Sequence, residues 1–280
     1  MEVAALYEAG EEDQVRYRSD DMPPLRLYLT EPSRALAELW LHYAACPLLP
    51  ALPKGDGHPV LVLPGLLADD ISTGPLRACL RRLGYRVHGW RLGRNVGPTA
   101  ECVGGMRDCL RGLRERYDRP VSLIGWSLGG IFARELARET PDLVRQVITL
   151  GSPFRMVRKT QSRAQRVFDR YSHLHVAGTT LPLEPENMPL PVPASSIYSR
   201  LDGIVAWQAC LDRPGPRAEN IAVIASHLGI GNHPAAIYAI ADRLAQPRGS
   251  WSPFRPPGVL RLAFPRPDEP PAQPTFPAAA

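Results

Sequence analysis

A serine between two glycines, where an apolar run meets a helical pattern, constrains this chain more than any other feature. Residues 121–124 form a mostly apolar run, and a Gly-x-Ser-x-Gly pattern follows at residues 125–129. From residue 131 to 138, apolar residues return at helical spacing. Strand, Gly-x-Ser-x-Gly and helix together predict a turn so tight that Ser127 takes a strained backbone conformation above the edge of a sheet.

The glycines of this turn have a steric purpose. A side chain at Gly125 or Gly129 would collide across the turn, and Gly130 lets the helix approach the strand closely. The five-residue pattern alone also occurs by chance at glycine-containing junctions between a strand and a helix. Here, however, a strand pattern precedes it and a helix pattern follows it, as the motif requires. The pattern therefore predicts that Ser127 is a nucleophile.

The remainder of the chain alternates apolar strands with amphipathic helices. Strands are predicted at residues 58–63, 85–90, 121–125, 144–150, 194–199 and 220–225. This alternation is typical of β-α-β units, so we expect an α/β fold with a mainly parallel sheet flanked by helices. Between residues 154 and 193 the alternation lapses, which we interpret as a short cap or lid inserted before the strand that carries the acid.

Three parts are expected along the chain. Residues 1–54 form an N-terminal extension with a helix that packs on the core, residues 55–246 form the catalytic domain, and residues 247–280 form a proline-rich tail whose end is disordered.

The helix of the N-terminal extension is predicted to begin at Ser33, as N-cap, and to run to residue 45. Leu36, Trp40 and Tyr43 recur on one face, and His42 lies on the opposite, polar face. We expect the apolar face to dock on the core. The alternative is that this face presses on lipid.

Composition and charge exclude some functions. An apolar content of 44% is ordinary for a soluble globular protein. The net charge of +5 comes almost entirely from scattered arginines without a dense basic stripe, which argues against a nucleic-acid partner. Five cysteines without a C-x-x-C pair favour a reduced, cytoplasmic setting. We find neither a signal-peptide pattern nor a run long enough to cross a bilayer, and peripheral membrane contact stays open.

A serine hydroxyl needs a base to take its proton, and that base needs an orienting acid. In a sheet of this kind the acid and then the histidine follow later strands. Asp202 comes after the strand at residues 194–199, and His227 comes after the strand at residues 220–225. Asp202 would hold the imidazole in the tautomer that accepts the serine proton. The rivals weighed against them are Asp169, Asp212 and His233.

An oxyanion formed during acyl transfer needs preorganised N–H donors. The backbone N–H of Leu128, directly after the nucleophile, is expected to be one of them. The other should come from the loop after the first strand, where Leu66 is the predicted donor.

Residues 55–246 resemble the α/β-hydrolase superfamily, in particular its bacterial lipase-like and esterase-like members. Five motifs carry the resemblance: Leu63-Pro64-Gly65-Leu66, Gly125-Trp126-Ser127-Leu128-Gly129, Thr149-Leu150-Gly151-Ser152-Pro153, Tyr198-Ser199-Arg200-Leu201-Asp202-Gly203 and Ser226-His227-Leu228-Gly229. One departure is Pro64, because many such lipases have a histidine before this glycine, and that histidine orients the oxyanion loop. The resemblance implies ester hydrolysis through an acyl-enzyme, without a metal or an organic cofactor.

The leading hypothesis is a serine hydrolase that cleaves a small-molecule or lipid-like acyl ester with Ser127, His227 and Asp202. The same residues could instead serve an acyltransferase, a thioesterase or a lactonase, and sequence does not separate these. A third reading, from another class, is a non-catalytic ligand-binding protein with a hydrolase fold. The intact serine, acid and histidine in the expected order argue against it.

Overall fold

A parallel sheet forms the centre of the molecule. The computed structural model describes residues 22–156, 159–177, 189–213 and 215–268. In this part of the chain six strands lie in the order β2-β1-β3-β4-β5-β6, and every neighbouring pair is parallel. The strands are β1 (Pro59–Leu63), β2 (Arg86–Gly89), β3 (Val121–Trp126), β4 (Val144–Leu150), β5 (Ala194–Tyr198) and β6 (Ala218–Ala222).

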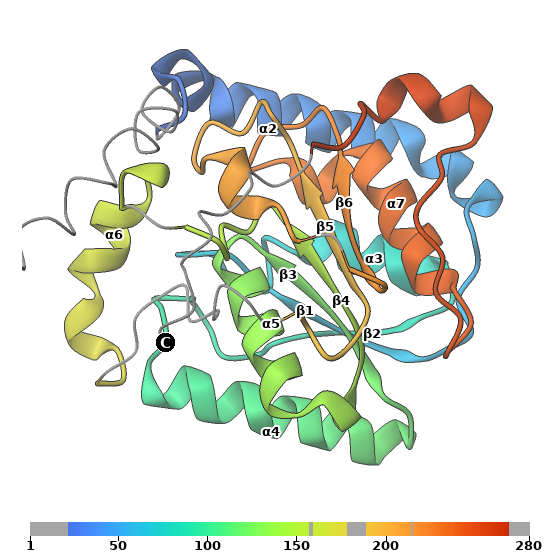
Figure 1. Ribbon diagram of the computed structural model, residues 1–280, viewed down its shortest axis with the longest axis horizontal. Coiled ribbons are helices and arrows are strands. Elements are labelled where there is room, and N and C mark those ends of the chain that lie inside the picture. Colours follow the sequence, from blue (N-terminus) through green and yellow to red (C-terminus); the bar gives the residue numbers. More distant parts are fainter. Residues whose placement is uncertain (1–21, 157–158, 178–188, 214, 269–280) are drawn as a thin grey trace, which may run out of the picture.

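Helices surround this sheet (Figure 1). The α-helices are α2 (Leu25–Ala45), α3 (Gly74–Arg82), α4 (Ala100–Tyr117), α5 (Leu128–Glu139), α6 (Gln165–Arg170) and α7 (Pro234–Ala245). Short 3₁₀ turns are η3 (Cys46–Ala51), η4 (Pro141–Leu143), η5 (Lys159–Gln161), η6 (Ser172–Leu174), η7 (Trp207–Cys210), η8 (Ile230–Asn232) and η9 (Gly258–Ala263). The predicted α/β fold with a mainly parallel sheet is confirmed.

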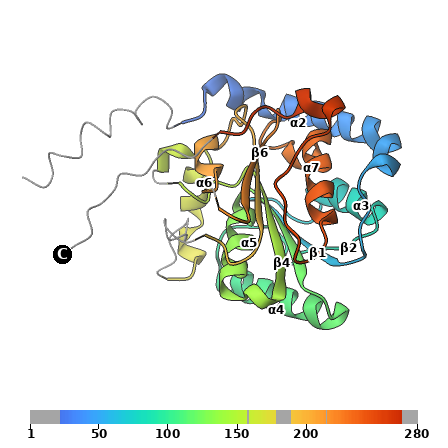
Figure 2. The same cartoon turned by 45° about the vertical axis from the view of Figure 1, so that its right-hand side comes forward.

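Two apolar layers bury the two faces of the sheet. Val60 and Val62 of β1 pack in one cluster with residues of α3 and α7. Leu61 and Leu63 of the same strand pack in the other cluster, with residues of α4 and α5. The two pairs of helices accordingly lie on opposite sides of the sheet (Figure 2). Because successive side chains of a strand point to opposite faces, an all-apolar strand is what a sheet covered on both faces requires.

The orientation predicted for the N-terminal helix is wrong. In α2 the side chains expected to face the core are the exposed ones, since Leu36, Trp40 and Tyr43 are 57%, 70% and 56% exposed. Glu38 and His42, from the polar face, are buried. The reason is that this face of α2 lies on loops whose backbone N–H groups need acceptors, and an apolar face would leave them unsatisfied.

Two predicted boundaries also differ from the structure. The helix α2 begins at Leu25, so Ser33 lies inside it and its hydroxyl donates to the Thr30 carbonyl at 3.0 Å instead of capping the helix. The last strand, β6, spans Ala218–Ala222 rather than residues 220–225. Beyond it the Ala225 N–H donates to the Ser199 hydroxyl at 3.1 Å, so a side chain and not a strand partner satisfies it.

The chain between β4 and β5 leaves the sheet and carries α6 between the short turns η5 and η6 (Figure 1). Residues 157–158 and 178–188 of the predicted cap lie outside the described residues, as does the end of the predicted tail at 269–280. The described part of the tail packs on the core, with the Phe254 and Phe264 rings 4.8 Å apart between centroids. Within the described ranges, no helix combines the length and apolar character needed to cross a membrane.

Candidate active site

Ser127 lies at the sharp turn between β3 and α5. Its backbone has φ of 52° and ψ of −120°, a conformation that non-glycine residues rarely adopt. The strained backbone predicted at this position is therefore confirmed. Such strain costs on the order of 1–3 kcal/mol and persists only where the surroundings enforce it. One restraint is the Ser127 N–H, which donates to the Leu150 carbonyl of β4 at 2.8 Å.

Close packing around the turn leaves no space for side chains at its two glycines. A Cβ at Gly125 would lie 2.2 Å from the Gly130 Cα, and one at Gly129 would lie 2.3 Å from the Leu63 carbonyl oxygen of β1. Both separations are far below van der Waals contact. The collision predicted at Gly129 thus involves the neighbouring strand rather than the far side of the turn.

The structure brings the side chains of Ser127, His227 and Asp202 together at the carboxyl ends of the strands. His227 Nε2 lies 3.0 Å from the Ser127 hydroxyl, and His227 Nδ1 lies 2.6 Å from Asp202 Oδ2. The other Asp202 oxygen accepts the N–H groups of Ile204 and Val205, each at 2.8 Å. A carboxylate fixed in this way holds the imidazole with Nε2 toward the serine.

The rival residues lie in other contacts. Asp212 pairs with the buried Arg134 guanidinium at 2.7 Å. His233 caps α7, and its Nδ1 accepts the Ala235 N–H at 3.2 Å. Asp169 of α6 pairs with a lysine of the cap at 3.3 Å.

Burial and charge act against each other on His227. Desolvation of this buried ring lowers the pKa of His227, whereas the charge and hydrogen bond of Asp202 raise it, and the net effect is a raised pKa. The nearby carboxylates, Asp202 foremost and Glu31 with it, together outweigh burial. The Asp202 carboxylate thus stabilises the positive charge that the imidazole gains when it takes a proton from the Ser127 hydroxyl.

The two predicted oxyanion donors lie beside Ser127. Leu66 and Leu128 line a small cavity of about 50 Å³ together with the serine. Leu128 is the first residue of α5, where a backbone N–H has no partner within the helix. In the described part of the chain, neither of the two N–H groups donates to another protein group. Both are thus available to an oxygen that lies close to Ser127.

Asn95, which sequence reasoning missed, holds the loop that contains Leu66. Its fully buried side chain donates to the Pro64 carbonyl at 2.8 Å. Its backbone accepts the Leu67 N–H at 2.7 Å and donates to the Ala68 carbonyl at 2.8 Å. These three bonds fix the loop at the position where Pro64 replaces the expected histidine. The only sequence signal was a polar residue inside a glycine-rich loop.

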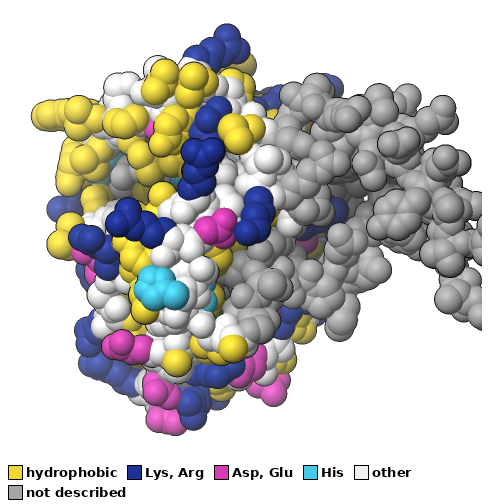
Figure 3. Space-filling view, turned by 90° about the vertical axis from the view of Figure 1, so that its left-hand side faces the viewer, with side chains coloured by type: hydrophobic (Ala, Val, Ile, Leu, Met, Phe, Trp, Pro, Cys, Tyr) yellow, Lys and Arg dark blue, Asp and Glu magenta, His cyan; other side chains and the backbone are white. Residues whose placement is uncertain are grey.

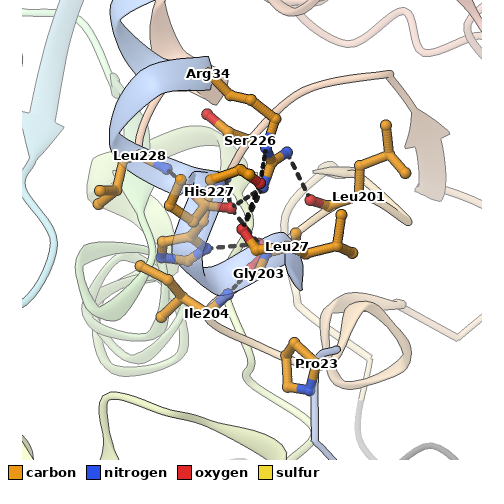
Figure 4. A network of polar contacts seen from close by, with 12 residues as sticks. Pro23, Leu27, Arg34, Leu201, Gly203, Ile204, Ser226, His227 and Leu228 are labelled. Atoms are coloured by element: carbon orange, nitrogen blue, oxygen red, sulfur yellow. Dashed lines mark hydrogen bonds and ion pairs between the residues drawn. The ribbon is translucent and has the colours of Figure 1, made fainter. Parts of the chain in front are cut away.

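Two carboxylates of α2 were also missed. Glu31 and Glu38 are 1% and 7% exposed, and both accept hydrogen bonds from the loop that carries His227. Figure 4 shows Ser226, His227 and Leu228 of that loop beside α2. Their spacing of seven residues places them on one face of a helix, which is a signal that the sequence did contain.

A larger cavity of about 410 Å³ opens at the same place. Ser127 and His227 line it, together with mostly apolar side chains that include Tyr28 of α2, Leu67 and Leu228. The lining predicts a preference for a group with an apolar surface.

We compared the sequence and the fold with those of known proteins. No family model matches the chain. The fold resembles the crystal structure of lipase B from Aspergillus fumigatus, with a TM-score of 0.54, 15% identity and coverage of 68% of this chain and 52% of that one. It also resembles a lipase of Bacillus licheniformis in its mature form, with a TM-score of 0.50, 15% identity and coverage of 69% and 94%. The chain has the α/β-hydrolase fold.

One curated protein resembles part of this chain in sequence. It is the pimeloyl-[acyl-carrier protein] methyl ester esterase of Shewanella woodyi, which is 31% identical over 109 residues. The match covers 39% of this chain and 41% of that protein, so it spans less than half of either. The α/β-hydrolase resemblance predicted from the five motifs is confirmed at the level of the fold.

Proposed function

We propose that this protein is a serine hydrolase that cleaves a carboxylic ester through an acyl-enzyme. One observation carries the proposal: the imidazole of His227 lies 3.0 Å from the Ser127 hydroxyl and 2.6 Å from the Asp202 carboxylate. This is the arrangement in which a histidine can remove the proton of an attacking serine.

In the first half of the reaction, the Ser127 oxygen attacks the ester carbonyl carbon while its proton moves to His227 Nε2. The carbonyl oxygen becomes an oxyanion, which the N–H groups of Leu66 and Leu128 stabilise. The bond between carbon and the alcohol oxygen then breaks, and His227 returns the proton to the departing alcohol. In the second half, His227 takes a proton from water, which attacks the acyl carbon. The bond between that carbon and the Ser127 oxygen then breaks, His227 returns the proton to the serine, and the acid leaves.

The substrate class follows from the cavity. The lining of this cavity is mostly apolar. Besides His227 it includes the charged side chain of Arg163. Hydrophobic side chains also gather on the face that carries α6, beside lysine and arginine side chains (Figure 3). These features favour a small-molecule or lipid-like acyl ester, and the esterase name of the Shewanella woodyi relative supports an ester substrate. The reaction needs no metal or organic cofactor, and we place it in the cytoplasm.

The proposal is tested with p-nitrophenyl esters of increasing chain length, using the wild type and Ser127→Ala. We expect the substitution to lower kcat/KM about 10,000-fold or more, because it removes the nucleophile. Thermal unfolding of the variant serves as the control for folding. A fluorophosphonate should label the wild type at Ser127 and leave the variant unlabelled. Equal turnover by the two proteins would end the proposal.

A further inference from the structure

The helix α2 presents two carboxylates to the loops that follow β5 and β6. A buried carboxylate is costly unless hydrogen-bond donors surround it. The Cβ that Gly203 lacks would lie 2.5 Å from the Leu27 carbonyl carbon of α2, so the helix backbone lies directly on the loop after Asp202. Only a residue without a side chain permits this approach.

Glu31 connects the acid loop with the histidine loop. Its Oε1 accepts the Gly203 N–H at 2.8 Å and the His227 N–H at 3.0 Å. Its Oε2 accepts the Leu228 N–H at 2.9 Å. One side chain thus receives hydrogen bonds from the residue after Asp202 and from His227 itself (Figure 4). The position of one loop relative to the other is thereby fixed through a third element.

Two further side chains of α2 complete this contact. Glu38 accepts the Ser226 N–H at 2.6 Å and also the Ser226 hydroxyl. The Arg34 guanidinium donates to Glu31 at 2.8 Å and to the Leu201 carbonyl at 2.9 Å. The backbone on both sides of Asp202 and His227 is therefore bound to α2.

We propose that Glu31 is a positioning residue of the active site, which sets the distance between Asp202 and His227 and adds negative charge near the imidazole. The inference rests on the proposed function, because it assigns Glu31 a part in the same reaction. Glu31 does not touch Ser127. It acts on the serine only through the histidine.

The charge of Glu31 reaches the imidazole as well. It adds to the effect of Asp202 in raising the pKa of His227 against the lowering effect of burial. The other charged groups near this site are Arg34, which pairs with Glu31, Glu38 at the neighbouring Ser226, and Arg163 in the lining of the cavity. Burial raises the pKa of Glu38.

The test is Glu31→Gln, which keeps the shape of the side chain but removes its charge and turns an NH₂ group toward a backbone N–H. We expect kcat for the best p-nitrophenyl ester to fall about 10- to 100-fold, because the base moves relative to the serine, while KM changes little. The imidazole titration of His227, followed by NMR, should move to lower pH by about 0.5.

Asp212→Asn is the matched control. Asp212 is another buried carboxylate in an ion pair, with Arg134. Among the described residues its hydrogen bonds join it to Arg134, Arg213 and Asn220, not to the three residues of the candidate site. If the inference is right, the Asp212→Asn variant matches the wild type in kcat per folded molecule and in the His227 midpoint. A folded Glu31→Gln protein with the kcat and the midpoint of this control would overturn the inference.

Arg34→Ala provides a second, independent variant should Glu31→Gln fail to fold. Arg34 is half-buried, and its removal leaves the Glu31 charge without its cation. The His227 midpoint should then move to higher pH, opposite to Glu31→Gln, with kcat about 3- to 10-fold lower. A wild-type midpoint and kcat in this variant would contradict the inference.

The NMR titration needs no turnover. A wild type that neither cleaves esters nor reacts with a fluorophosphonate would defeat the proposed function alone. The midpoints of the Glu31 and Arg34 variants would still decide whether α2 controls His227.

Discussion

The turn at Ser127 and the helix α2 both shape the candidate active site, yet they relate to the sequence in opposite ways. At the turn, β3 and α5 adjoin the serine directly, and the steric demand falls on glycines within three residues of it. In α2 the determining contacts reach loops on the far side of the sequence, 172 and 196 residues away. A local pattern therefore predicts the first region, whereas hydrophobic periodicity gives the wrong orientation for the second.

The difference shows what a helical pattern measures. The apolar stripe of a helix faces the interior when the surface beneath the helix consists of apolar side chains. The surface beneath α2 includes the backbone N–H groups of Gly203, Ser226 and Leu228, and for these a carboxylate is the better partner. The apolar stripe of α2 then remains outside.

The largest expected effect is a loss of kcat/KM on substitution of Asp202, the acid that the sequence predicts from its place after a strand. Asp202→Asn should lower kcat/KM about 1,000- to 10,000-fold, because the amide no longer holds the imidazole in the productive tautomer. Asp212→Asn, at the rival aspartate paired with Arg134, should keep its activity per folded molecule. Steady-state kinetics of both variants checks this. A larger loss at residue 212 than at residue 202 would reverse the assignment.

The next effect concerns stability and tests the inverted orientation of α2. Trp90 is 2% exposed, and Trp40 is 70% exposed. Trp90→Ala should lower the free energy of unfolding by about 3–5 kcal/mol, since it leaves a cavity in the core. Trp40→Ala should change the same quantity by less than about 0.5 kcal/mol. Urea unfolding measures both, and similar losses would mean that the apolar face of α2 is buried after all.

The smallest effect is a shift in pH dependence. Since the pKa of His227 is raised above 6.5, the acidic limb of the kcat/KM profile should have its midpoint above pH 6.5. Activity needs the neutral imidazole, so it falls as the pH drops below that midpoint. The pairing with Asp202 stabilises the folded state fully below pH 6.5, and this contribution is lost as the pH rises through the folded pKa. A midpoint at or below pH 6.5 would mean that burial outweighs the carboxylate.

The sequence was sufficient for the sheet, for the turn at Ser127 and for the residues that converge on it. The strand β1 is apolar along its length, and Asp202 and His227 lie in the loops after β5 and β6, so a parallel sheet brings them to one edge. Asn95 could not be found in this way, and for Glu31 the sequence shows only a helix face shared with Glu38, not the loops that this face contacts. Their importance lies in hydrogen bonds to the backbone of distant loops, and a backbone N–H leaves no mark in the sequence.

The contact between Glu31 and the loops has a consequence for the order of events during synthesis. A ribosome makes the N-terminal part of a chain first, so α2 emerges long before its partners Gly203, His227 and Leu228. Until those residues appear, both carboxylates of its inner face remain in water. A growing chain can therefore complete the turn at Ser127 while His227 has not been made, so the proposed chemistry has to wait until the loop after β6 is translated.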